Sequence, residues 1–211
     1  MESLAGAVWL TLGLVVVGGY LLGSIPFGLI ATRLGGAGDI RNIGSGNIGA
    51  TNVLRSGRKD LAAITLLGDA GKGVLAVFLA RWLTNDSGVM VALAGGAAFL
   101  GHLFPVWLKF KGGKGVATFY GVLLAAAWPV GVLAAITWLA MAFIFRISSL
   151  AALTATALAP LFALATDRGW PMVGLTVFMA VLVFIRHHEN IGRLLKGQEP
   201  KIGSKKDKKA E

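Results

Sequence analysis

Long apolar stretches alternate with short polar loops along almost the whole chain. The first covers about residues 4–32 and is interrupted at 23–27, where Pro26 is expected to kink the helix. The remaining stretches cover about 61–82, 88–108, 116–145, 147–166 and 170–185. The stretch at 116–145 is too long for one membrane-crossing helix, so we expect a turn at Trp128-Pro129 to divide it. The pattern predicts an all-α bundle of about seven transmembrane helices.

The amino-acid composition favours the same fold class. Apolar residues make up 55% of the 211 positions and charged residues only 14%, against about a quarter in an average soluble domain. We therefore predict a polytopic integral membrane protein with a single domain, residues 1–203. A polar, Lys-rich tail follows at 204–211, which we expect to be disordered. The chain has no cysteine, which excludes disulfide bonds and catalysis by a thiolate.

The positions of lysine and arginine predict the orientation in the membrane. Seven spans place four segments on one side, and these hold 17 of the 20 Lys and Arg residues: 33–60, 109–114, 146 and 186–211. The positive-inside rule then puts the N-terminus outside and the C-terminus in the cytoplasm. The basic tail fits contact with anionic lipid headgroups, and no pattern typical of nucleic-acid binding accompanies it.

One polar segment, GHLFPVWLKFKGGKGVAT at 101–118, combines lysines with glycines. Gly112, Gly113 and Gly115 surround Lys114, and an apolar helix is predicted to begin at Val116. Glycines let backbone N–H groups turn toward one point, and a helix N-terminus favours negative charge. The segment is therefore a candidate phosphate site at the membrane surface. The alternative is a tight turn whose lysines only help to orient the protein.

A second glycine-rich loop, GSGNIGATN at 44–52, is followed by Arg55. It formally matches the dinucleotide motif G-x-G-x-x-G, but that motif requires a preceding strand, whereas this loop lies between two membrane spans. Glycine N–H groups, short polar side chains and a guanidinium suit a phosphate. The alternative is a polar turn that only caps helices. The polar candidates are Ser45, Asn47, Thr51 and Asn52.

Four further positions carry polar groups whose roles the residues alone leave open. Asp69 and Lys72 are three apart in an apolar stretch, so they share one helix face and form either a structural ion pair or part of a site. Ser148 and Ser149 begin another stretch, where a hydroxyl caps a helix or binds a substrate oxygen.

His187 and Asn190 also share a face, at the end of the last apolar stretch. The histidine is a candidate general base, a phosphate donor or an interfacial polar residue. With three histidines and no acidic cluster in the chain, a metal site is not expected.

Three motifs, taken in order, resemble one family. SGNIGATN at 45–52 with Arg55, FKGGKGVAT at 110–118 with Gly101-His102 and Phe104-Pro105 before it, and RHHENIGRLLKGQE at 186–199 are similar to the bacterial membrane glycerol-3-phosphate acyltransferases that use acyl phosphate, the PlsY family. The resemblance covers nearly the whole chain up to Gly203. It implies a seven-helix enzyme of the bacterial cytoplasmic (inner) membrane with a cytoplasmic active site.

The resemblance also implies the reaction and the site. A fatty acyl group would pass from acyl phosphate to the 1-hydroxyl of sn-glycerol 3-phosphate, giving lysophosphatidic acid and phosphate, with no cofactor and no metal. The acyl-phosphate site would fall on Ser45 and its loop (Gly46, Asn47, Thr51, Asn52) and on Gly112, Gly113 and Gly115. The glycerol-phosphate and catalytic positions would fall on Arg55, Lys114, Ser149, His187 and Asn190; the choice between Ser148 and Ser149 stays open.

An acyl phosphate is already activated, so the enzyme needs no covalent nucleophile. We expect catalysis by alignment and by electrostatic stabilisation of the oxyanion, with the proton passing to His187 or to a donor phosphate oxygen. Two other classes remain: a transporter or permease for a phosphorylated small molecule, and a scaffolding or lipid-binding membrane protein.

Overall fold

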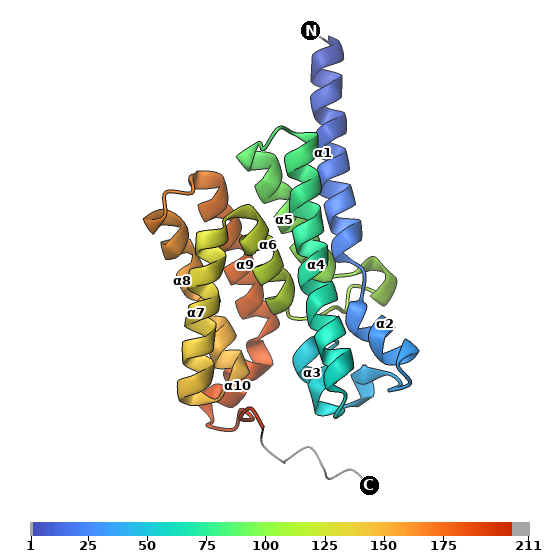
Figure 1. Cartoon of the computed structure of the whole chain (residues 1–211), viewed down its shortest axis with the longest axis vertical. Coiled ribbons are helices and arrows are strands. Elements are labelled where there is room, and N and C mark those ends of the chain that lie inside the picture. Colours follow the sequence, from blue (N-terminus) through green and yellow to red (C-terminus); the bar gives the residue numbers. More distant parts are fainter. Residues whose placement is uncertain (1, 204–211) are drawn as a thin grey trace.

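The computed structural model describes residues 2–203, and within this range it contains helices and no strands (Figure 1). The predicted tail at 204–211 lies outside the described residues. The elements are α1 (Glu2–Gly23), α2 (Phe27–Leu34), η1 (Ile40–Asn42), α3 (Ala50–Arg55), α4 (Lys59–Leu83), α5 (Gly88–Leu103), η2 (Val106–Leu108), α6 (Val116–Ala126), α7 (Trp128–Phe145), α8 (Ser148–Ala165), α9 (Trp170–Arg186) and α10 (His188–Leu195).

Two helix breaks confirm what the sequence predicted. α1 ends at Gly23 and α2 begins at Phe27, because Pro26 has no N–H to donate and fixes its own backbone torsion. The long apolar stretch divides at Ala127, where α6 ends and α7 begins with Trp128 and Pro129 in its first turn.

Helix length and hydropathy alone identify fewer candidate spans than the predicted seven. By length and hydropathy, five segments of the described chain qualify as spans, or six if α9 and α10, which are bent by 65°, count as one. α6 has 11 residues, about 16 Å of helix, which is too short to cross a hydrocarbon core of about 30 Å. The integral membrane class is confirmed, while the count of seven and the orientation of the termini stay predictions.

The helices pack into one bundle with α6 in its middle. α1 packs on α4 and α5, α8 packs between α7 and α9, and α6 contacts both α4 and α7. Large side chains such as Phe99, Phe119 and Met179 fill the core where α5, α6 and α9 meet. Glycines permit close backbone contacts: a Cβ at Gly121 would lie 2.0 Å from the Ala70 carbonyl oxygen.

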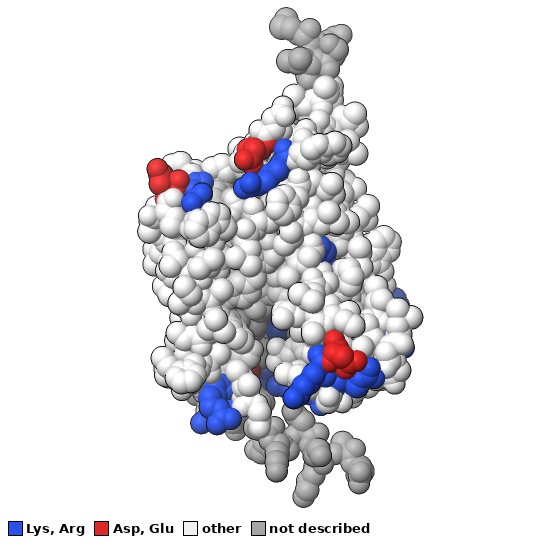
Figure 2. Space-filling model, in the orientation of Figure 1, with Lys and Arg blue, Asp and Glu red and all other residues white. Residues whose placement is uncertain are grey.

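The polar segment between α2 and α4 has a small core of its own. Leu29, Ile40, Ile48, Val53 and Leu61 are buried together beneath the loop that contains the first glycine motif. α3 and α10 lie at the same end of the molecule (Figure 1). Lys and Arg side chains gather at that end, and fewer charged groups lie at the other end (Figure 2).

Candidate active site

The Gly-Lys loop connects η2 to α6, and its last glycine is required by the fold. Gly115 is the N-cap of α6 with a φ of 84°, a left-handed conformation that favours glycine. A Cβ there would also lie 2.4 Å from Cε2 of Phe99. Lys114 therefore stands directly before the first turn of α6, whose N–H groups have no partner inside the helix. A cationic side chain and a helix N-terminus meet at this point.

The other two glycines are held by their neighbours on both sides. The N–H of Gly112 donates to the Leu103 carbonyl at 3.0 Å, and that of Gly113 donates to the His102 carbonyl at 3.1 Å. Arg186 donates to both glycine carbonyls, to Gly112 at 2.8 Å and to Gly113 at 3.1 Å. The expected N–H nest is thus not made by these two amides, because both are already paired. The loop is instead a rigid support for Lys114.

Lys114 is the first member of a chain of polar contacts that ends at Glu199. Its ammonium donates to Oδ1 of Asn190, and Nδ2 of Asn190 donates to Glu199 Oε1. These two contacts fix the orientation of the Asn190 amide. Because Lys114 is bonded to a neutral amide oxygen and not to the carboxylate, its positive charge remains available to an anionic ligand.

Ser149 and Arg193 complete the set around the same carboxylate. Ser149 Oγ donates to Glu199 Oε1 at 2.7 Å, and Arg193 Nε donates to Oε2 at 2.6 Å. The N-cap of α8 is Ile147, so the Ser149 hydroxyl is directed to Glu199 rather than to capping. Ser149 is buried, whereas Ser148 is half-buried. Of the two serines, the structure thus brings Ser149 into the cluster.

Burial and charge shift the pKa values of this cluster in physically consistent directions. Burial, together with the nearby positive charge of Arg193, lowers the pKa of Lys114. For Glu199, burial alone would raise the pKa, but hydrogen bonds from Ser149, Asn190 and Arg193 outweigh it and lower the pKa. The carboxylate is therefore ionised at neutral pH.

His187 is placed at the bend between α9 and α10. Its Nδ1 lies 2.8 Å from the Val183 carbonyl oxygen. A carbonyl only accepts hydrogen bonds, so Nδ1 carries a proton and Nε2 of the neutral ring keeps its lone pair. The side chain is buried, in contrast to the neighbouring His188. His187 thus has the tautomer that a general base requires.

The first glycine loop is shaped from within by Asn52. Oδ1 of Asn52 accepts from the Ser45 N–H at 2.9 Å and from the Ser45 hydroxyl at 3.3 Å. Its Nδ2 donates to the carbonyls of Ile40 and Ile43. All of these contacts lie within residues 40–52, so Asn52 holds the loop against η1 and maintains its conformation, and its amide is not presented to a ligand. Gly44, with a φ of 55°, lets the Arg55 side chain pack against its Cα.

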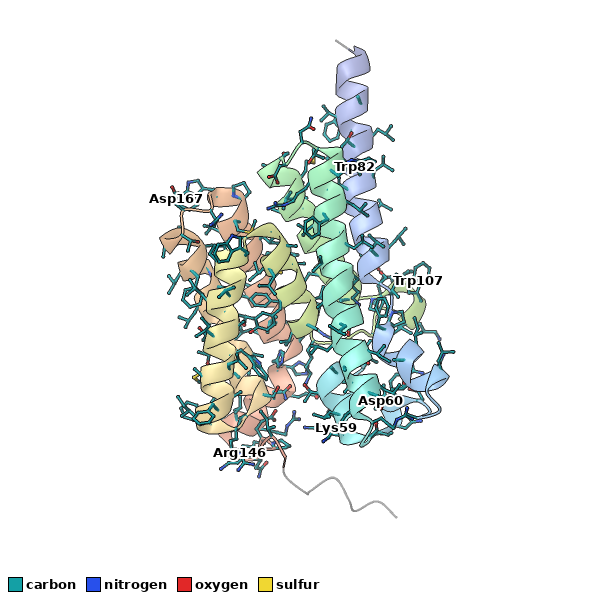
Figure 3. All side chains as sticks on the ribbon, in the orientation of Figure 1. Lys59, Asp60, Trp82, Trp107, Arg146 and Asp167 are labelled. Carbon is teal, nitrogen blue, oxygen red and sulfur yellow. The ribbon has the colours of Figure 1, made fainter. Side chains whose placement is uncertain are left out.

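The remaining candidates of this loop differ in their exposure to solvent. Ser45 and Thr51 are exposed, while Gly46, Asn47 and Gly49 are half-buried. Asn47 packs against Gly49, where an added Cβ would lie 3.1 Å from Nδ2 of Asn47. This loop, together with α3, lies at the end of the bundle that also carries α10 (Figures 1 and 3).

Three residues of the cluster had no assigned role in the sequence reasoning: Arg186, Arg193 and Glu199. All three fall inside the third motif, so their place in it was the available signal. The roles of Arg186 and Glu199 could not be inferred because they depend on contacts with distant segments, and Arg193 acts through Glu199. Among residues 2–203, no group of three or more His, Cys, Asp and Glu side chains is arranged to hold a metal ion.

Comparisons with known proteins agree on one family. The model of the family described as glycerol-3-phosphate acyltransferase matches residues 13–197. A glycerol-3-phosphate acyltransferase of Caulobacter vibrioides strain NA1000 is 80% identical over 98% of this chain and 94% of its own length. One from Maricaulis maris is 61% identical over 90% of this chain and 86% of its own length.

Solved structures extend the likeness to the fold. The crystal structure of PlsY (YgiH), described as an integral membrane glycerol 3-phosphate acyltransferase in its glycerol 3-phosphate form, superposes with a TM-score of 0.86 at 38% identity, over 91% of this chain and 96% of that one. Its lysophosphatidic acid form gives a TM-score of 0.85 at 37% identity, over 91% and 95%. The chain therefore belongs to the glycerol-3-phosphate acyltransferase family.

Proposed function

We propose that this protein transfers a fatty acyl group from acyl phosphate to the 1-hydroxyl of sn-glycerol 3-phosphate. The products are lysophosphatidic acid, the first acylated precursor of phospholipids, and inorganic phosphate. Family membership supports the acceptor, because the related solved structures are described in glycerol 3-phosphate and lysophosphatidic acid forms. The observation that carries the proposal is the Lys114 cluster: a cation with its charge uncompensated by direct contact, at the N-terminus of a helix.

The chemistry requires two anions to be held together. The acceptor oxygen attacks the acyl carbon of the mixed anhydride, the bond from that carbon to the bridging oxygen breaks, and phosphate leaves. Lys114 and the first-turn N–H groups of α6 stabilise the developing oxyanion, and Arg55 with the Ser45 loop binds phosphate. The hydroxyl proton passes to Nε2 of His187 or to a phosphate oxygen of the donor.

No covalent intermediate is needed because the donor is already activated. The chain has no cysteine to supply a thiolate. Ser149 donates its proton to a carboxylate rather than to a histidine, which is the wrong arrangement for an activated serine nucleophile. Alignment of the two substrates, with electrostatic stabilisation, then accounts for the rate.

The donor is tested by an assay with purified full-length protein in vesicles. Labelled glycerol 3-phosphate is supplied with a long-chain acyl phosphate, with the matching acyl-CoA, or with the matching acyl-carrier protein. We expect labelled lysophosphatidic acid with acyl phosphate alone. Product from either thioester at an equal rate refutes the donor assignment. Uptake of label into the vesicles without any acylated product would favour the transporter instead.

The proposal also includes the location of the enzyme: the bacterial inner membrane, with the active site on its cytoplasmic side.

A further inference from the structure

Three ionisable side chains are buried in the middle of the bundle, outside the Lys114 cluster. Asp69 and Lys72 of α4 are 2% and 4% exposed, and His102 of α5 is 3% exposed. Lys72 Nζ lies 2.8 Å from Asp69 Oδ1, and His102 Nδ1 lies 3.4 Å from the same oxygen. Buried charges in a membrane helix are costly, and such residues therefore mark a requirement of the site or of the fold.

The histidine of this group forms the floor of the Gly-Lys loop. A Cβ added to Gly113 would lie 2.2 Å from Nε2 of His102, so only glycine lets the backbone rest against the ring. The Gly113 N–H also donates to the His102 carbonyl. Asp69 faces the opposite nitrogen of that ring, and Lys114 follows Gly113 directly. Asp69 is thus linked to Lys114 by two steps: its contact with the His102 ring, and the contact of that ring with Gly113, the residue before Lys114.

Lys72 connects this group to the loop at 44–52 through the α1–α2 break. Lys72 Nζ donates to the Ile25 carbonyl at 2.8 Å, inside the break between α1 and α2. The Ile25 carbonyl also accepts from the Phe27 N–H at 3.1 Å, so the ammonium is a second donor to this oxygen and ties α4 to the break. α2 then contacts the first glycine loop through its backbone: a Cβ at Gly28 would lie 1.8 Å from the Ile48 carbonyl oxygen. The conformation of the α1–α2 break therefore determines the position of the loop at 44–52.

We infer that Asp69, Lys72 and His102 form a positioning network, in which one buried carboxylate sets both substrate-binding loops of the site described above. Its His102 branch supports the Gly112–Lys114 turn, and its Lys72 branch fixes the α1–α2 break beneath the Ser45 loop. The inference rests on the proposed function for what the loops bind. The ion pair between Lys72 and Asp69 compensates both charges at this depth in the bundle.

Paired substitutions separate positioning from a merely structural ion pair. In D69L/K72M both charges are replaced by apolar groups, a change that buried ion pairs often tolerate without loss of stability. D69N/K72M keeps an oxygen facing His102 but removes the tie to Ile25. Thr176→Val is the matched control, because the Thr176 hydroxyl is buried and bonds only within α9. H102N removes the part of the ring that meets Gly113.

The readouts are steady-state kinetics, thermal unfolding and hydrogen exchange of backbone amides in the full-length protein. For D69L/K72M we expect kcat to fall about 100-fold, because small misplacements of a site cost this much in rate. Exchange should rise at both 44–52 and 112–118 while the rest of the bundle stays protected. In D69N/K72M the rise should be confined to 44–52, and in H102N to 112–118.

A folded D69L/K72M protein with kcat and loop exchange equal to those of Thr176→Val overturns the network and leaves an ion pair that only joins helices. If that variant does not fold, H102N and D69N/K72M decide by the loop in which exchange rises, and a rise in neither overturns the inference. The exchange data do not depend on turnover, so an inactive wild-type protein would sink the proposed function without affecting this test.

Discussion

Replacing Glu199 by alanine removes the acceptor on which three side chains converge. The Ser149 hydroxyl and the Asn190 amide are buried, 7% and 8% exposed, and both lose their partner. A buried donor left unpaired costs about 1–3 kcal/mol, so the two together cost roughly 2–6 kcal/mol of unfolding free energy. Arg193 is 36% exposed at its side chain, and its ion pair contributes about 1 kcal/mol or less.

The assay is thermal unfolding of the purified protein in detergent, with turnover measured in parallel. For a chain of this length, the lower bound of about 2 kcal/mol corresponds to a melting temperature at least about 4 °C lower. Turnover should fall as well, because Asn190 no longer orients toward Lys114. Glu199→Gln keeps an oxygen for Ser149 and Asn190 and should regain most of the stability. The exposed Glu189 provides the matched control, Glu189→Gln.

The pH dependence follows from the lowered pKa of Glu199. Burial opposes ionisation, but the three hydrogen bonds outweigh it, so the folded-state pKa lies below the ordinary value of 4.5. The stabilisation is complete above pH 4.5 and is lost as the pH falls through the folded-state pKa. Wild-type protein should therefore lose more stability on acidification than Glu199→Gln. Equal melting temperatures for Glu199→Ala and Glu199→Gln at neutral pH would refute this reasoning.

Two further substitutions test the site. His187→Gln should lower kcat by about 10²–10⁴ if Nε2 accepts the hydroxyl proton, whereas the exposed His188→Gln should be near normal; a near-normal kcat for His187→Gln leaves the donor phosphate as the base. Gly113→Ala should abolish most turnover, since its Cβ would lie 2.2 Å from a buried ring nitrogen, while Gly71→Ala, with no atom within 4 Å, should leave turnover unchanged; an active Gly113→Ala protein would mean that the loop is not rigid.

The helix breaks could be predicted because their causes are local. Pro26 and the Trp128-Pro129 pair impose their effects on the neighbouring backbone whatever surrounds them. The span count could not be fixed in the same way. Hydrophobicity continues through 116–126, but the helix there is only 11 residues long, and hydropathy alone does not reveal that length.

The sequence motifs identified candidate residues of the site but not the contacts between them. Glycines and a lysine at 112–115 indicate a special turn, but the pattern does not show that carbonyls at the end of α5 take two of its N–H groups. Glu199 is fifty residues from Ser149 and nine from Asn190. Its role therefore depends on the segment after α10 folding back against α8 and α10, which the motif alone does not show. Asp69 and Lys72 were recognised as a pair, but the contact with His102 required the packing of α4 on α5.

The most direct test of the account is the turnover of Lys114→Ala with acyl phosphate and glycerol 3-phosphate, measured against Lys111→Ala, an exposed lysine of the same loop. Loss of one neutral donor from an oxyanion site already costs about 10²–10³ in kcat, so loss of this cation should lower kcat by at least about 10³. Lys111→Ala should stay within about twofold of wild type. A Lys114→Ala protein with kcat near that of Lys111→Ala would contradict the claim that this loop is where the substrates meet.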